Sequence, residues 1–426
     1  MKTEAGRFAG VYSSMGSVMA QAGKNCCPFS LEDGEGDKME YPLEGAPFIG
    51  DGPLRKFLAR RGWIRPGPAG LVVAAAACAL ICWLPLLLIS AAQGLALGDA
   101  VRVPFLLDFA SHIRFLVAVP LLMIAEVPVG KRLGLTAREF VRSGLVRGRD
   151  LSAFRSSYGK ASRLGNSALA MACLLALALL GLLGGLSAEL AHFSTWQIAG
   201  TGAVMRRTAA GWWYAAVSLP LYRFFIYLWL WRLAVWTWFL QRVSRIDLAL
   251  DPIHPDQAGG LGFLALGQEP FGIITFAAAS VISAAMARQI VFEGASFFSF
   301  KFLIAGFIFL SVLLFTAPLF LFTRKLYHLK ETGLFEYGAF ASAYTRDFAQ
   351  KWIKGSTEGS PLGTPDIQSL SDLSNSFQII RKMRIIPMDL KNFILLLAAA
   401  VGPMVPLVLM SFPLETIVGR IIRMVF

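Results

Sequence analysis

Seven apolar runs, each long enough to cross a lipid bilayer, constrain the fold of this chain more than any other feature. A spanning helix needs roughly 20 consecutive apolar residues, since the hydrocarbon core is about 30 Å thick. Only 16% of the 426 residues are charged and 56% are hydrophobic, whereas about a quarter of the residues of a soluble domain are charged. We therefore predict an all-α, polytopic membrane bundle. Its seven spans are expected at about 69–92, 105–127, 164–187, 211–240, 270–291, 302–323 and 393–412.

The basic residues between these runs are distributed unevenly, which predicts the orientation. The 128–163 loop holds nine lysine and arginine residues, and the 324–392 loop holds ten. The other side holds only Arg102, Arg206, Arg207, Arg288, Lys301, Arg420 and Arg423. Cytoplasmic loops carry the excess of basic residues in polytopic proteins. We therefore expect the N-terminus in the cytoplasm and the C-terminus outside.

The segments outside the spans complete the predicted organisation. The first 53 residues have no sustained apolar period and are typical of a disordered soluble tail. The basic residues that follow either lie on anionic lipid headgroups or only reflect the topology. The TARE sequence of Thr136–Glu139 fits a capping box and predicts that a helix begins there. The predicted parts are a tail over 1–53, a juxtamembrane segment over 54–68, a six-span bundle over 69–323 with a helical inner loop at 128–163, a cytoplasmic helical loop over 324–392, and a seventh span with an amphipathic end over 393–426.

The second run carries four ionisable residues, which are costly in hydrocarbon and often mark a pathway or a pair. At about 100° per residue, one helical face holds Asp108, His112, Phe115, Val119, Leu122 and Glu126. This face is polar at both ends and apolar in the middle, which is typical of a lined pathway with an apolar constriction. Alternatively, Asp108 and Glu126 lie at the water boundaries, and Asp108 pairs with His112 one turn away.

Two arginines, Arg114 in the second run and Arg223 in the fourth, lie at a similar, near-central depth. Unpaired central arginines are costly unless they bind carbonyls, water or an anion, so we hypothesise that they handle an anion. The alternative is that carbonyls freed by nearby prolines satisfy them, or that Arg223 stacks on Tyr227 one turn below it. Arg232 is expected to snorkel to the inner headgroups.

The predicted cytoplasmic loop after the fourth run is rich in polar and conformationally special residues. Its candidates are Asp251, His254, Asp256, Gly259, Gly260 and Gly262. Three interpretations stay open: a divalent metal site at His254 and Asp256, the inner mouth of a pathway, or a rigid turn, because prolines, glycines and aspartates also suit turns. The pattern DxxHPDxAGGLGFL, beginning at Asp251, resembles a signature of uncharacterised bacterial multipass inner-membrane proteins. This resemblance implies a bacterial inner membrane and no particular activity.

The leading functional hypothesis is a channel or transporter-like protein for a small anionic solute. The net charge of +13 does not indicate nucleic acid, because the basic residues alternate with apolar runs instead of covering a water-exposed face. The sequence has no P-loop, kinase or hydrolase motif, and we expect no cofactor. One alternative is a membrane sensor or scaffold whose inner helices, such as one expected over Leu334–Ile353, bind a partner. A metal enzyme is the third. The bilayer is the expected partner, and the oligomeric state is left open.

Overall fold

The computed structural model describes residues 48–49, 68–188, 194–201, 204–355 and 364–411. These residues are mostly helical, with one short β-hairpin, and the all-α prediction is confirmed. The tail and juxtamembrane segment predicted over 1–68 lie outside the described residues, apart from residues 48, 49 and 68, and so does the predicted end beyond residue 411.

The first half of the chain contains one uninterrupted helix, one interrupted helix and a bent pair. The uninterrupted helix is α3 (Pro68–Ala92), which contains Pro85. The interrupted helix consists of η1 (Phe105–Leu107), α4 (Phe109–His112), η2 (Ile113–Ala118), α5 (Val119–Ile124) and α6 (Glu126–Arg142). The bent pair is α7 (Gly148–Gly165) and α8 (Ala168–Ala188), which meet at 40°. The antiparallel hairpin of β1 (Ile198–Thr201) and β2 (Val204–Arg207) pairs Ile198 with Arg207, and α9 (Ala209–Trp213), η3 (Tyr214–Ser218) and α10 (Leu219–Val243) follow.

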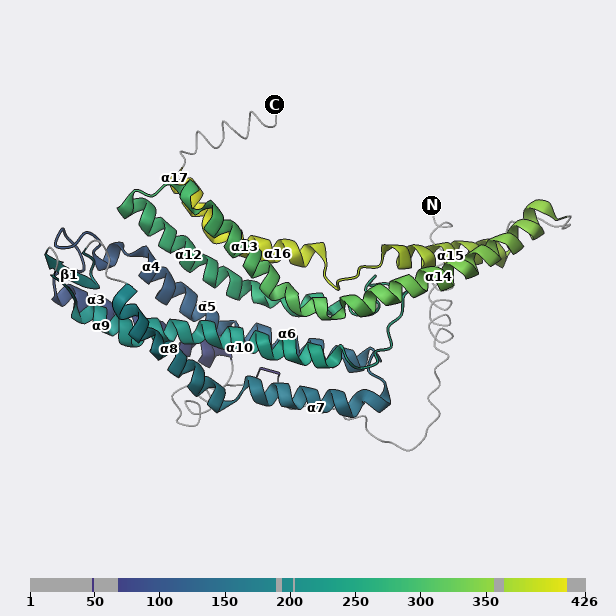
Figure 1. Cartoon of the computed structure of the whole chain (residues 1–426), viewed down its shortest axis with the longest axis horizontal. Helices are drawn as coiled ribbons and strands as arrows, with labels where there is room; N and C mark the ends of the chain where they lie inside the picture. The colour runs from purple at the N-terminus through teal and green to yellow at the C-terminus, as the bar shows by residue number, and fades with distance from the viewer. Residues whose placement is uncertain (1–47, 50–67, 189–193, 202–203, 356–363, 412–426) are drawn as a thin grey trace, which may run out of the picture. The chain divides into compact units, whose positions relative to one another are not determined.

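The second half contains the remaining helices. They are α11 (Phe263–Gln268), η4 (Glu269–Phe271), α12 (Gly272–Glu293), η5 (Phe297–Phe300), α13 (Lys301–Thr316), η6 (Ala317–Phe322), α14 (Thr323–Phe348), η7 (Ala349–Lys354), α15 (Pro365–Lys382), α16 (Leu390–Val401), η8 (Gly402–Met404) and α17 (Val405–Ser411). Helix α12 ends at Gly294, whose φ of 68° is the left-handed conformation that commonly terminates a helix. Figure 1 shows α14 and α15 side by side, and the two helices contact each other.

Five helices in the described chain are long and apolar enough to cross a membrane, and the count is six if the bent α7–α8 pair forms one span. The five helices cover Ala69–Ala92, Phe109–Arg142, Phe263–Glu293, Phe297–Lys354 and Leu390–Met410. The 211–240 run is helical, but its arginines, tryptophans and tyrosines lower its hydropathy, and it is not among the five. The chain is therefore an integral membrane protein of helical type, while the count of seven and the orientation stay predictions.

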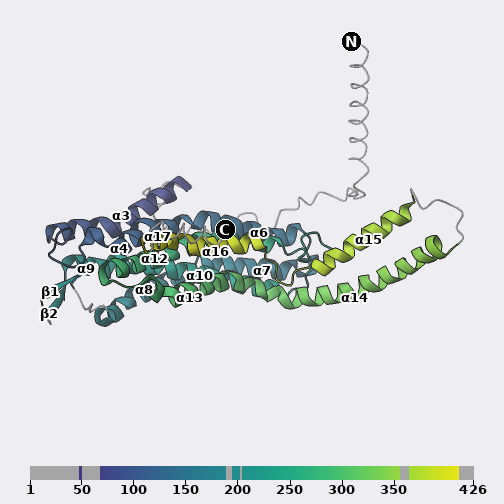
Figure 2. The same ribbon diagram turned by 90° about the horizontal axis from the view of Figure 1, so that it is seen from above.

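The helices form a bundle in which α10 packs against α7 and α8, α3 packs against α5 and α9, and α12 packs against α4, η2 and α16 (Figures 1 and 2). An aromatic core fills the space between α7 and α10. Its members are Phe48, Phe154, Tyr158, Trp236 and Phe239, and Phe48 lies edge-on to Trp236 with ring centroids 5.0 Å apart. Offset and edge-on aromatic pairs of this kind contribute about 0.5–1.5 kcal/mol beyond their buried area.

Two of the π-helical segments stand directly before a proline in the helix that follows. Segment η2 precedes Pro120 and η3 precedes Pro220. A proline has no N–H to donate and its ring clashes with the carbonyl four residues earlier, so the preceding turn widens to accommodate it. A widened turn changes which side chains share a face, because the rule of 100° per residue holds only for a regular α-helix.

Two expected helix starts were wrong. The capping box predicted at Thr136 lies inside α6, where the Thr136 hydroxyl donates to the Arg132 carbonyl at 2.9 Å instead of capping an end. The helix expected to begin at Leu334 is α14, which begins at Thr323 and continues from η6 without leaving helical structure. In both cases the apolar run and the polar loop helix form one continuous element.

Candidate functional site

The acidic residue near the start of the second run is buried, and one of its two carboxylate oxygens is hydrogen-bonded. Asp108 stands before α4 and is only 2% exposed. Its Oδ2 atom accepts hydrogen bonds from Ser111 Oγ at 2.6 Å and from Trp196 Nε1 at 3.0 Å. The alternative pairing of Asp108 with His112 is wrong, because His112 Nδ1 accepts from Trp83 Nε1 at 2.8 Å and its Nε2 lies 3.1 Å from the Leu106 carbonyl. These two contacts require the neutral imidazole with its proton on Nε2.

Arg114 is held by two tyrosines of the neighbouring helix. Its Nη1 donates to the Tyr214 hydroxyl, and its guanidinium carbon lies 6.0 Å from the Tyr214 ring centroid and 5.6 Å from that of Tyr222. Tyr214 is 4% exposed and packs edge-on against Phe115. Aromatic faces stabilise a guanidinium by about 0.5–2 kcal/mol, depending on desolvation. Neutral groups therefore position Arg114 and leave its charge uncancelled by a direct carboxylate contact.

A polar cavity of about 290 Å³ opens beside Arg114. It is lined by Asp108, Ala110, Ser111, Arg114, Thr195, Gln197, Ile198, Tyr214, Ala285 and Arg288. These residues come from α4 and η2, from the segment entering β1, from η3 and from α12. We name this the Arg114–Arg288 cavity.

Arg288 is a residue of this cavity that was not among the predicted site residues. It falls within the span expected at 270–291, where it served only to predict the orientation, and the structure places it in α12 with its side chain lining the cavity. Within the described chain Arg288 makes no hydrogen bond or ion pair, and its Nε is buried. Two guanidiniums and one carboxylate thus share the cavity wall, and this excess of positive charge favours a ligand with one negative charge.

Arg223, the other predicted central arginine, is not part of this cavity. Its guanidinium lies over Gly181 of α8, where a Cβ atom would come within 2.5 Å of Nη1. The expected stack of Arg223 on Tyr227 is not formed, since the described aromatic contacts of arginines involve other rings. The structure therefore brings Arg114 together with Arg288 and not with Arg223.

At the far end of the second run, Glu126 forms a buried ion pair. Its Oε1 lies 2.6 Å from Arg232 Nη2, and the two side chains are 16% and 3% exposed. The Arg232 guanidinium also lies over the Trp229 ring, 5.1 Å from its centroid. The expectation that Arg232 snorkels to headgroups is wrong, because Arg232 turns inward to the carboxylate. Between this pair and the cavity, Val119 and Leu122 are buried at 0% and 1% exposure.

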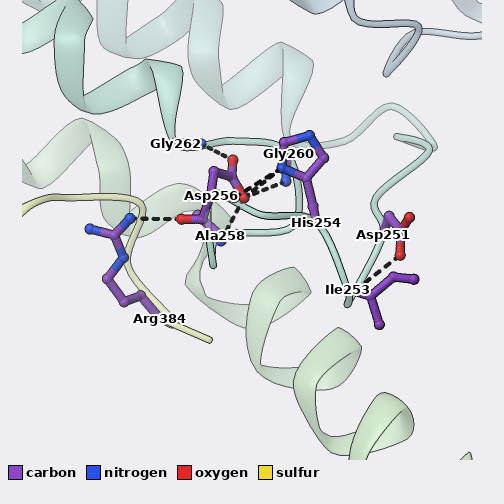
Figure 3. Close-up of polar contacts among 8 residues, drawn as sticks. All are labelled: Asp251, Ile253, His254, Asp256, Ala258, Gly260, Gly262 and Arg384. Carbon is purple, nitrogen blue, oxygen red and sulfur yellow. Dashed lines mark hydrogen bonds and ion pairs between the residues drawn. The ribbon is translucent and has the colours of Figure 1, made fainter. Parts of the chain in front are cut away.

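The glycine-rich loop after α10 is organised by the Asp256 carboxylate (Figure 3). Oδ1 accepts from the amides of Ala258 at 2.8 Å and Gly260 at 3.1 Å, and Oδ2 accepts from the amide of Gly262 at 2.7 Å. His254 Nδ1 lies 2.8 Å from Oδ1. Burial alone would raise the pKa of Asp256, but the three amides and His254 together outweigh it and hold this pKa below its usual range.

The same loop is fixed to the rest of the chain from two sides. Arg384, which follows α15, donates from Nη2 to the Asp256 carbonyl at 2.8 Å, and Figure 3 shows it approaching from the side opposite His254. Gly260 has a φ of 90°, which strongly disfavours any other residue. Asp251 caps its own turn by accepting from the Ile253 amide at 3.0 Å. The geometry supports the rigid-turn interpretation of this loop.

A divalent metal site at His254 and Asp256 would need a third ligand, which the described residues do not supply. Among the described residues no group of three or more histidine, cysteine, aspartate or glutamate side chains comes together at a distance suited to a metal ion. Both oxygens of Asp256 already accept amide hydrogen bonds. The arrangement therefore resembles an anchored turn more than a coordination site.

Comparison with known proteins gives no relative from which to transfer a function. No protein-family model, no curated protein and no solved structure matches this chain. The fold defines the class, an integral membrane protein built of helices.

Proposed function

We propose that this integral membrane protein binds a small monovalent anion in the Arg114–Arg288 cavity and carries it across the membrane. The observation that carries the proposal is the convergence of two guanidiniums from different helices on one space that holds a single carboxylate, Asp108. Arg114 is fixed by Tyr214, and Arg288 has no partner among the described side chains. The Nε atom of Arg288 is buried without a hydrogen-bond partner, which is unfavourable for a cation, and a bound anion removes that penalty.

A carrier fits the packing better than an open channel does. Val119 and Leu122 are almost completely buried on the stretch beyond the cavity, and Glu126 and Arg232 close the far end of that stretch with an ion pair. Passage of an anion therefore requires these contacts to rearrange, as in alternating access. The proposed membrane is the bacterial inner membrane, which rests on the resemblance of the loop at Asp251.

The test is anion uptake by liposomes containing the purified full-length protein. Chloride, nitrate and formate are supplied separately, each as a monovalent probe. Arg288→Gln is expected to lower uptake about tenfold or more, since a hydrogen bond to a charged group contributes about 1.5–3 kcal/mol. Lys301→Gln is the matched control: it removes one cation at the start of α13, outside the cavity lining. Uptake equal to that of empty liposomes, or equal rates for wild type and Arg288→Gln, contradicts the proposal.

A scaffold is the second candidate, and exposed apolar side chains on α14 and η7 favour it. Phe335, Phe340 and Ile353 are 74%, 62% and 73% exposed. Exposed apolar surface of this kind suits contact with another protein. The liposome experiment separates the two candidates, because a scaffold gives no anion flux and no response to Arg288→Gln.

A further inference from the structure

A second polar cavity lies at the opposite end of α10. It measures about 450 Å³ and is lined by Arg149, Asp150, Ala153, Ser157, Arg242, Arg245, Ile246 and Asp247. The walls are the first turns of α7 and the end of α10 with the residues after it. Because α7 and α10 pack along each other, the bundle fixes the distance between the two walls. We name this the Arg242–Arg245 cavity.

One arginine, Arg149, lies close to both acidic residues of this cavity. Arg149 lies 2.5 Å from Asp247 and 3.6 Å from Asp150. A further cation, Lys325 of α14, donates to the Ile246 carbonyl at the edge of the cavity. Within the described chain, Arg242 and Arg245 have no carboxylate partner. Three arginines and two aspartates line the cavity, so its lining carries a net charge of +1.

The two unpaired arginines are positioned for an anion at the membrane surface. Arg242 lies over the Trp238 ring, 5.3 Å from its centroid, and this contact stabilises the guanidinium beside the ring. Tryptophan near the end of an apolar helix is typical of the headgroup region. The planar guanidinium matches the oxygen geometry of a phosphate, and Ser157 adds a hydroxyl to the same wall. Basic cavities between helices on the cytoplasmic side suit phospholipid headgroups.

We propose that the Arg242–Arg245 cavity binds a phosphate group, held by the guanidiniums of Arg242 and Arg245. The group has two sources, the headgroup of an anionic phospholipid and free inorganic phosphate. This site shares no lining residue with the Arg114–Arg288 cavity, and phosphate binding here does not depend on anion transport there.

The experiment is calorimetric titration of the purified full-length protein in detergent. The probes are dioctanoyl-phosphatidylglycerol, uncharged dioctanoylglycerol of the same chain length, and sodium phosphate. We expect Arg242→Gln/Arg245→Gln to weaken phosphatidylglycerol binding about 30-fold, since each basic residue near an anionic headgroup contributes about 1 kcal/mol. Arg242→Lys/Arg245→Lys keeps the charge but loses the planar geometry, and is expected to lie between wild type and the glutamine variant.

The control variant is Arg155→Gln/Lys160→Gln, which removes the same charge from exposed positions of α7 outside the cavity. It is expected to bind phosphatidylglycerol like wild type. Binding of phosphatidylglycerol without binding of sodium phosphate assigns the lipid as source, whereas saturable phosphate binding that the glutamine variant loses assigns free phosphate. Equal weakening by the two glutamine double variants, equal binding of dioctanoylglycerol, or no binding of either phosphate probe overturns the proposal.

Discussion

The buried ion pair between Glu126 and Arg232 allows a sharp stability test. Glu126→Gln removes the negative charge while keeping the size of the side chain. Arg232 is 3% exposed and its Nε has no hydrogen-bond partner, so the carboxylate at 2.6 Å and the Trp229 ring are what compensate the guanidinium in the described structure. Neutralising one member of a buried pair leaves an uncompensated charge, which costs about 3–5 kcal/mol.

A second ion pair supplies the control. Arg132 and Glu269 lie 2.8 Å apart, but their side chains are 37% and 24% exposed. Solvent screens such a pair, so Glu269→Gln is expected to cost about 1 kcal/mol or less. The free energy of unfolding is measured by titrating the full-length protein with sodium dodecyl sulfate in mixed micelles, followed by tryptophan fluorescence.

A third variant separates charge from packing. Glu126→Gln/Arg232→Met removes both charges and fills the site with an apolar chain of similar length, which restores most of the lost stability if the uncompensated guanidinium is its cause. Equal losses for Glu126→Gln and Glu269→Gln, or a double variant no more stable than Glu126→Gln, would show that the uncompensated Arg232 guanidinium is not the cause of the lost stability.

Further predictions concern the glycine-rich loop and two close approaches of glycine. Asp256→Asn should destabilise the loop by about 1–3 kcal/mol, because three amides lose a charged acceptor, and pepsin cleavage of the loop measures the effect. Since the pKa of Asp256 is lowered in the folded state, its contribution to loop stability is complete above the unfolded pKa of about 3.9 and is lost as the pH falls through the folded pKa. Because pepsin's own activity changes with pH, cleavage is expressed relative to that of an unstructured reference peptide. This relative cleavage should rise below about pH 4 in the wild type and stay nearly constant in the variant. Gly181→Ala should change the free energy of unfolding by less than about 1 kcal/mol, because the atom it meets is the flexible end of Arg223. Gly211→Ala should cost about 1–3 kcal/mol in the same unfolding assay, because its Cβ would lie 2.1 Å from the rigid backbone oxygen of Gln197; similar values for these two variants would contradict the close approach at Gly211.

The turn at Asp256 shows what the sequence can predict. An aspartate followed within six residues by three glycines contains the acceptor, the donors and the left-handed positions of the observed loop, so a rigid turn was among the interpretations drawn from local pattern. The contact from Arg384 was not predictable in this way. It joins residues 128 positions apart, and no local pattern records such a distance.

The residues that line the Arg114–Arg288 cavity could not be brought together from the sequence. The sequence predicts Arg288 near the end of the 270–291 run, and no local pattern indicates that either Arg288 or Tyr214 faces Arg114. Their positions beside Arg114 depend on how η3 and α12 pack against η2. Helical arithmetic across 108–126 also assumed a regular α-helix, whereas the chain has a widened turn at Ile113–Ala118. A partner on another helix leaves no periodic signal in the sequence of either helix.

The wide turns before Pro120 and Pro220 have a consequence for how this bundle can change and still fold. A π segment is equivalent to one extra residue inserted into an α-helix, and removing it rotates everything beyond by about 100°. Arg114 lies inside one such segment and Tyr214 begins the other, and Arg114 donates a hydrogen bond to the Tyr214 hydroxyl. Beside the Arg114–Arg288 cavity, each of the two helices therefore contains one residue more than a regular α-helix would. Deleting a single residue from either segment would rotate one of these two side chains away from the other, while the long helix that follows the segment would stay intact.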